Sequence, residues 1–87
     1  MKVAVWDTYV YREEGNLMHF DILVPENLTD EQTILAYGLE YLKTKDFKTN
    51  RLTSKECRLC HVEQATEEII AAIQTQGYYI IEMENCN

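Results

Sequence analysis

The sequence predicts a single α+β domain over residues 1–87, a two-layer sandwich in which two helices pack on one face of a four-stranded mixed sheet. The expected element order is β-β-α-β-α-β. Two observations support this fold. Residues 2–11 and 17–24 alternate with the two-residue period of strands. Segments 29–45 and 66–76 carry helix-capping residues and apolar stripes at helical spacing.

The two N-terminal strands are expected to form a hairpin. Glu13-Glu14-Gly15 fits a three-residue loop between Arg12 and Asn16, because Gly15 adopts the left-handed conformation of such loops without a steric penalty. This loop sets the register. It pairs mainly apolar residues on the face that we expect to form the core: Val10 with Met18, Thr8 with Phe20, Trp6 with Ile22 and Ala4 with Val24.

The other face of this hairpin contains a candidate polar site. The same register places Tyr9 opposite His19 and Asp7 opposite Asp21. Facing carboxylates repel each other unless water, a cation or a protonated histidine lies beside them. Two carboxylates and an imidazole suit a weak divalent-metal or proton-handling site. The competing interpretation is a solvated second face of the sheet, where polar residues need no ligand.

The first helix is predicted from its capping residues. Pro25 ends the second strand, and Thr29-Asp30-Glu31-Gln32 has the pattern of a capping box that begins a helix. The apolar stripe of this helix continues to about Lys45. Gly38 lies within the stripe, so we expect close approach to the strands there.

The C-terminal half is predicted to contain two strands and a helix. Thr66 caps a helix that stops at Gly77, and residues 78–84 follow as a strand apolar enough on both faces to lie inside the sheet. Residues 57–63 complete the sheet as a strand. The alternative is a helix that begins at Thr53, because Thr53-Ser54-Lys55-Glu56 is itself a capping-box pattern.

Composition and charge narrow the classes of partner. The formal net charge of −7 disfavours nucleic-acid binding, although residues 43–58 contain six basic and only two acidic residues. Only four consecutive apolar residues precede the first carboxylate, too few for a signal peptide or a membrane span. We therefore expect a cytoplasmic protein with no membrane partner. Because that compartment is reducing, its three cysteines are expected to be free thiols or metal ligands and not to form disulfides.

The densest group of reactive side chains is Cys57-Arg58-Leu59-Cys60-His61. Cys-x-x-Cys-His is the attachment signature of covalent haem, but the missing export signal and the strand-rich pattern argue against haem. A dithiol redox site is favoured by the nearby basic residues but requires a helix N-terminus. Simple packing of the thiols is a further interpretation. A tetrahedral zinc site would combine three thiols with one imidazole: Cys57, Cys60 and Cys86 with His19 or His61.

Four segments together form a distinctive pattern: Asp7-Thr8-Tyr9, Met18-His19-Phe20-Asp21, Thr53–His61, and Gly77–Glu84 with Cys86. This pattern, and above all its Glu-Cys-x-x-Cys-His block, resembles the family of small bacterial proteins called domain of unknown function 2024. The resemblance implies a compact α+β domain of bacterial origin. No activity, substrate or cofactor is established for that family, so no functional residue is carried over.

A binding role is the function that the sequence favours, because no catalytic motif is recognisable. Tyr9, Tyr11, Leu17 and Leu23 lie on the face opposite the predicted helices, where exposed apolar and aromatic side chains favour a partner. We expect a non-enzymatic interaction module that self-associates, in the simplest case as a homodimer. The alternative is a zinc-binding or thiol-redox protein that uses the Cys57–His61 segment.

Overall fold

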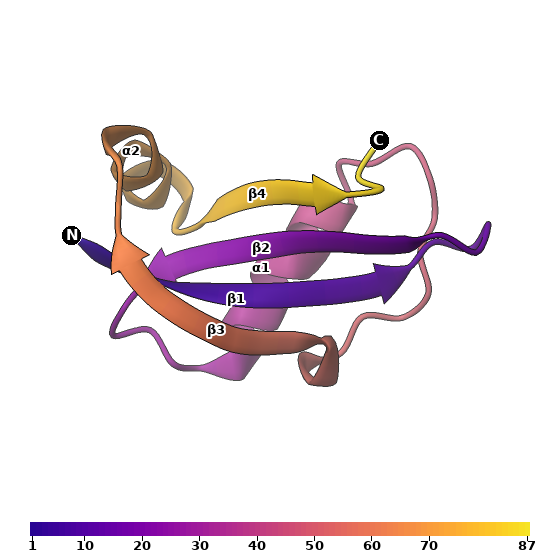
Figure 1. Cartoon of the computed structure of the whole chain (residues 1–87), viewed down its shortest axis with the longest axis horizontal. Helices are drawn as coiled ribbons and strands as arrows, with labels where there is room; N and C mark the ends of the chain where they lie inside the picture. Colours follow the sequence, from indigo (N-terminus) through magenta and orange to yellow (C-terminus); the bar gives the residue numbers. More distant parts are fainter.

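The computed structural model describes residues 1–87 and contains the predicted elements in the predicted order (Figure 1). The α+β class and the order β-β-α-β-α-β are confirmed. Neither helix is long and apolar enough to cross a membrane. The strands are β1 (Lys2–Tyr11), β2 (Leu17–Pro25), β3 (Cys57–Gln64) and β4 (Tyr79–Glu84), and the helices are α1 (Glu31–Leu42) and α2 (Glu67–Gln76).

The β1–β2 hairpin forms as predicted. Gly15 has a φ of +108°, and its N–H donates to the Arg12 carbonyl at 2.9 Å. The Arg12 N–H in turn donates to the Asn16 carbonyl at 2.8 Å, which closes the loop. All the predicted cross-strand pairs are present, on both faces. The turn chemistry therefore determines which side chains of the two central strands face each side of the sheet.

The sheet is antiparallel throughout, with strand order β3-β1-β2-β4 (Figure 1). The predicted mixed sheet is wrong, because β3 pairs antiparallel with β1 and β4 pairs antiparallel with β2. The prediction that residues 78–84 lie inside the sheet is also wrong. β4 pairs only with β2, at an edge, and its apolar residues Ile80 and Ile81 are half-buried on opposite faces.

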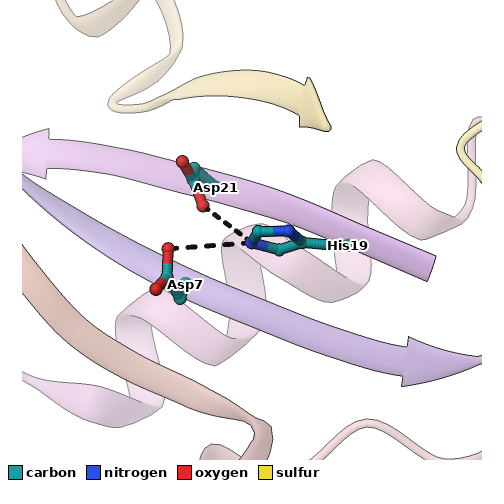
Figure 2. Close-up of side chains that lie close together, drawn as sticks. All are labelled: Asp7, His19 and Asp21. Carbon is teal, nitrogen blue, oxygen red and sulfur yellow. Dashed lines mark ion pairs between the residues drawn. The ribbon is translucent and has the colours of Figure 1, made fainter. Parts of the chain in front are cut away.

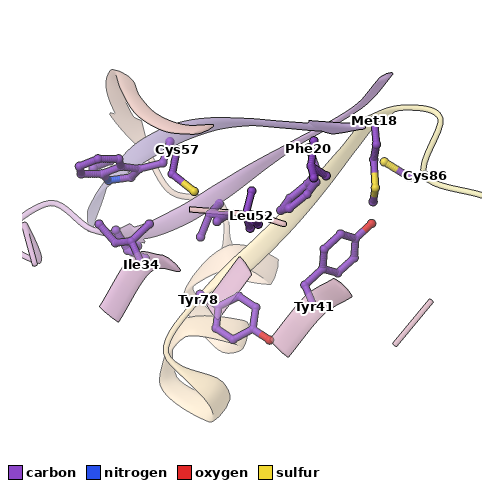
Figure 3. Close-up of a cluster of buried hydrophobic side chains, with 13 residues drawn as sticks. Met18, Phe20, Ile34, Tyr41, Leu52, Cys57, Tyr78 and Cys86 are labelled. Carbon is purple, nitrogen blue, oxygen red and sulfur yellow. The ribbon is translucent and has the colours of Figure 1, made fainter. Parts of the chain in front are cut away.

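The two helices pack on opposite faces of the sheet, so the predicted placement of both on one face is wrong. α1 covers the face of Trp6, Phe20 and Ile22, where thirteen buried residues form the larger core (Figure 3). Because side chains alternate along a strand, Val3, Val5 and Leu23 point away from α1 and require separate cover. α2 supplies this cover at one end of the sheet through two side chains: Ile69 and Ile73.

The ends of both helices follow local capping chemistry. Asp30, rather than Thr29, caps α1, because its carboxylate accepts a hydrogen bond from the Thr33 hydroxyl at 2.6 Å and a longer one from the Gln32 N–H. α1 ends at Leu42, one turn earlier than predicted. α2 has the predicted boundaries, with Thr66 as its N-cap and Gly77 at a φ of +98° after its last residue.

Gly38 brings α1 close to the sheet, as predicted. A Cβ atom at this position would lie 3.1 Å from both the Ile22 Cδ1 and the Leu52 Cδ2 atoms. A larger side chain would have to displace both of these core residues. The contact between α1 and the sheet thus depends on the absence of a side chain at position 38.

Gly38→Leu is expected to lower the free energy of unfolding by about 1–3 kcal/mol through overpacking of the core. The matched control is Ala36→Leu on the exposed side of the same helix, which should change stability by no more than about 0.5 kcal/mol. Urea unfolding followed by circular dichroism measures both. Equal stability of the two variants would contradict the close approach described above.

Candidate functional site

A polar cluster occupies the second face of the sheet where α2 no longer covers it. Asp7 lies on β1, and His19 and Asp21 lie on β2 (Figure 2). Their ligand atoms all lie within 4.8 Å of one another. The His19 Nε2 atom is 3.3 Å from the Asp21 Oδ1 atom and 3.7 Å from the Asp7 Oδ1 atom. Three groups capable of binding a metal ion therefore converge from the two central strands.

Tyr9 holds the imidazole of His19 in place. The two residues are a cross-strand pair, and their rings stack with centroids 4.1 Å apart and planes 12° apart. This stacking is a favourable aromatic arrangement on a sheet surface. It leaves the Nε2 edge of the ring directed toward the two carboxylates (Figure 2).

The two carboxyl groups titrate differently although they face each other. Burial, followed by the neighbouring Asp7 carboxylate, raises the pKa of Asp21 to about 6. Burial also acts to raise the pKa of Asp7, but its hydrogen bonding with Asp21 and Cys60 and its electrostatic interaction with His19 outweigh this effect and lower the pKa of Asp7. Asp7 is therefore the carboxylate that ionises first, and Asp21 holds its proton to higher pH.

Two polar atoms of the cluster lack hydrogen-bond partners. The Nε2 atom of His19 and the Oδ1 atom of Asp21 are buried, and neither makes a hydrogen bond. Their 3.3 Å separation is an ion-pair distance without hydrogen-bond alignment. Asp21 as a whole is only 9% exposed. Buried polar groups in folded proteins nearly always have a partner, so these two atoms distinguish the cluster from an ordinary polar surface.

Two of the three cysteines lie in the α1-side core, on the opposite side of the sheet from this cluster. Figure 3 shows Cys57 and Cys86 at opposite ends of that core, with Leu52 and Phe20 between them. The Cys86 thiol donates to the backbone carbonyl of His19 at 3.3 Å, on the side of the sheet away from the His19 imidazole. The structure therefore does not bring Cys57 and Cys86 together.

The Thr53–Glu56 pattern acts locally and does not start an α-helix. Thr53 and Glu56 form the capping box, but it closes only the single 3₁₀ turn η1 (Ser54–Glu56). The predicted strand then begins at Cys57, so the strand prediction is confirmed and the alternative of a helix that begins at Thr53 is wrong, apart from its capping box. Cys57 consequently lies at the start of a strand, where its side chain enters the core, and not at a helix N-terminus.

Cys60 and His61 lie on β3, and both are exposed. The His61 Nδ1 atom is 3.2 Å from the Cys60 Sγ atom, and its Nε2 atom is 3.0 Å from a carboxylate oxygen of Glu63. The Asp7 carboxylate raises the pKa of the Cys60 thiol, and burial raises that of Cys57. Both shifts oppose the thiolate character that a dithiol redox site requires.

Residues 1–83 match the family model described as Domain of unknown function (DUF2024). This chain belongs to the DUF2024 family. The NMR structure of protein NE1680 from Nitrosomonas europaea, a structural genomics target, superimposes on this DUF2024 protein with a TM-score of 0.84 and 38% sequence identity. The match covers 100% of each chain. No curated protein matches the chain.

Sequence reasoning placed some of the candidate residues of this DUF2024 protein correctly relative to one another. Tyr9 and His19, and Asp7 and Asp21, are neighbours as predicted because the hairpin register is local. The irregularity at Cys60 in the pairing of β1 with β3 was missed. We found no sequence signal that marks this irregularity.

Asp21 is expected to titrate near pH 6, where burial and Asp7 place its pKa. Asp7→Asn should lower this pKa but leave it above the ordinary value of 3.8, because burial is the larger cause. NMR of the carboxyl carbons as a function of pH measures both values. A wild-type Asp21 that titrates at or below 3.8 would refute this account of the cluster.

The raised pKa of Asp21 makes the free energy of unfolding depend on pH. The folded-state pKa of Asp21 is above its unfolded value, so its contribution to the free energy of unfolding falls as pH rises from about 4 to about 6. Asp21→Asn cannot ionise and should gain stability relative to the wild type over this window. Urea unfolding at several pH values tests the sign.

Proposed function

We propose that this DUF2024 protein binds a divalent cation through Asp7, His19 and Asp21. The observation that carries the proposal is the pair of buried atoms without partners, His19 Nε2 and Asp21 Oδ1, that face the Asp7 carboxylate. Leaving such a group unsatisfied costs about 1–3 kcal/mol. A cation coordinated by all three residues satisfies both atoms and removes the repulsion between the carboxylates.

The environment of the cluster and the chemistry of its ligands support this function. The ligands lie on the two central strands of the sheet, whose pairing holds them more rigidly than a loop would. Tyr9 packs against the imidazole and orients it, as supporting residues around metal sites commonly do. Carboxylate oxygens together with an imidazole nitrogen suit borderline divalent ions. We place this binding role in the cytoplasm, where three free thiols persist.

Isothermal titration of metal-free protein with Zn²⁺, Co²⁺ and Mn²⁺ tests the proposal. The wild type should bind at least one of these ions at a single site. His19→Ala and Asp21→Asn should each weaken binding by about 10-fold or more, because each removes a ligand. The matched control is Asp46→Asn, an exposed carboxylate outside the cluster, which should leave affinity unchanged. A wild type that binds none of the ions at millimolar concentration refutes the proposal.

A second candidate function is self-association through the hairpin end of the same face. Tyr9, Tyr11 and Leu17 are 43%, 54% and 38% exposed, and Tyr11 pairs with Leu17. Leu23 does not belong to this surface, because it is buried beneath α2. The expected patch is therefore smaller than the sequence suggested. We propose that a second copy of the chain covers Tyr9, Tyr11 and Leu17 in a homodimer.

Tyr11→Glu is expected to convert this dimer to a monomer, because it places a charge in the middle of the proposed interface. Leu59→Glu is the matched control, since Leu59 is 56% exposed but lies on β3 and pairs with Trp6, whose side chain faces α1. Sedimentation equilibrium at tens of micromolar measures both variants. A monomeric wild type under these conditions contradicts self-association.

A further inference from the structure

We infer that a groove beside α1 binds a small amphipathic anion, which is an apolar chain with a carboxylate at one end. The groove has a volume of about 600 Å³ and is lined by Leu35, Leu39 and Leu42 of α1, by residues 43 and 47–52 that follow the helix, and by Glu13 of the hairpin loop. It shares no residue with the Asp7–His19–Asp21 cluster. The inference is therefore independent of the proposed metal site.

Much of the groove lining is apolar. Leu52 is buried in the α1-side core, and three further side chains are partly buried against that core: Leu35, Leu42 and Phe47. Leu39, on the same helix, is 40% exposed. Concave apolar surface is typical of ligand sites, and the volume lies within the range of about 300–1,000 Å³ found for small-molecule pockets. The groove can therefore take an apolar chain of modest length.

Three basic side chains line the same groove: Lys43, Lys48 and Arg51. All three are exposed, and none of them forms an ion pair within the chain. The only acidic residue of the lining is Glu13. The groove thus has an excess of two positive charges in a protein whose net charge is −7. Such a local field attracts anions and repels cations.

The groove also explains part of the basic window at residues 43–58. Lys45 from this window pairs with Glu82, and Lys55 and Arg58 lie outside the groove. A lysine on a solvated loop needs no partner by itself. Here three unpaired cations lie beside apolar surface in one concave site, and this combination matches the two ends of an amphipathic anion. The charge complementarity therefore identifies the class of ligand.

Backbone hydrogen bonds hold the far wall of the groove in place. The Glu13 N–H donates to the Lys48 carbonyl at 2.9 Å, and the Asn50 N–H donates to the Tyr11 carbonyl at 2.8 Å. These bonds fix the segment that follows α1 against the end of the β1–β2 hairpin (Figure 1). The groove is thus largely formed before a ligand arrives, so binding requires little ordering of the backbone.

NMR titration of the ¹⁵N-labelled full-length chain with octanoate tests the inference. Octanoate should shift the amide resonances of Leu39 and of residues 42–52, with a dissociation constant in the millimolar range or lower, as expected for a ligand of this size. Butanoate should bind about 10-fold or more weakly, because it buries four fewer methylene groups. Octylammonium has the same chain length and the opposite charge, and it should also bind about 10-fold or more weakly.

Charge reversal at the groove provides the matched variants. Lys48→Glu combined with Arg51→Glu should weaken octanoate binding by about 10-fold or more, because the carboxylate is then repelled. The control is Lys55→Glu combined with Arg58→Glu, which changes the net charge equally at exposed positions outside the groove and should change the affinity by less than about 2-fold. All four positions are exposed, so we expect both variants to fold.

Four results would overturn the inference. The first is the absence of octanoate-dependent shifts at the groove amides at millimolar concentration. The second is equally tight binding of octylammonium or butanoate, which would remove the role of the charge or of the apolar lining. The third is an equal effect of the two double variants on octanoate affinity. The fourth is a shift of the same amides with protein concentration alone, which would show that a second copy of the chain occupies the groove.

Discussion

The register between β1 and β2 is the constraint on which the rest of this structure depends. Both strands are central, so their pairing determines the composition of each face of the whole sheet. The hairpin loop with Gly15 at positive φ sets that pairing. A slip of one residue would exchange the faces, exposing Phe20 and Ile22 and burying His19 and Asp21. The apolar core and the polar cluster are therefore two results of one backbone arrangement.

This register also determines which face of the sheet each helix covers. α1 covers the larger apolar face, where Phe20 and Ile34 are fully buried, each worth about 1.5–3 kcal/mol of burial free energy. The second face is apolar only toward the start of β1 and the end of β2, and α2 covers that part. The polar cluster lies beyond it. A larger second helix would cover this part of the face as well, and the position of α2 leaves the candidate site without a helix over it.

The candidate site departs from the usual chemistry of a sheet surface. Two carboxylates face each other across the central strands, and one of them is largely buried. Such an arrangement costs stability unless a partner compensates it, and local departures of this kind are concentrated at functional sites. Membership of a family without an established activity does not identify a function, so the argument for one rests on these side chains and their geometry.

The sequence by itself determined the local features of this protein. Turn chemistry, two-residue alternation and capping residues act over a few positions, so they identified the hairpin pairs, including Asp7 with Asp21 and Tyr9 with His19, and the limits of α2. Only the tertiary structure decided the antiparallel strand order, the opposite placement of the helices and the bulge at Cys60 in the pairing of β3 with β1. These features arise from pairing between segments that are distant in the sequence. The arrangement that buries the most apolar surface over the whole chain is selected, and no local pattern specifies it.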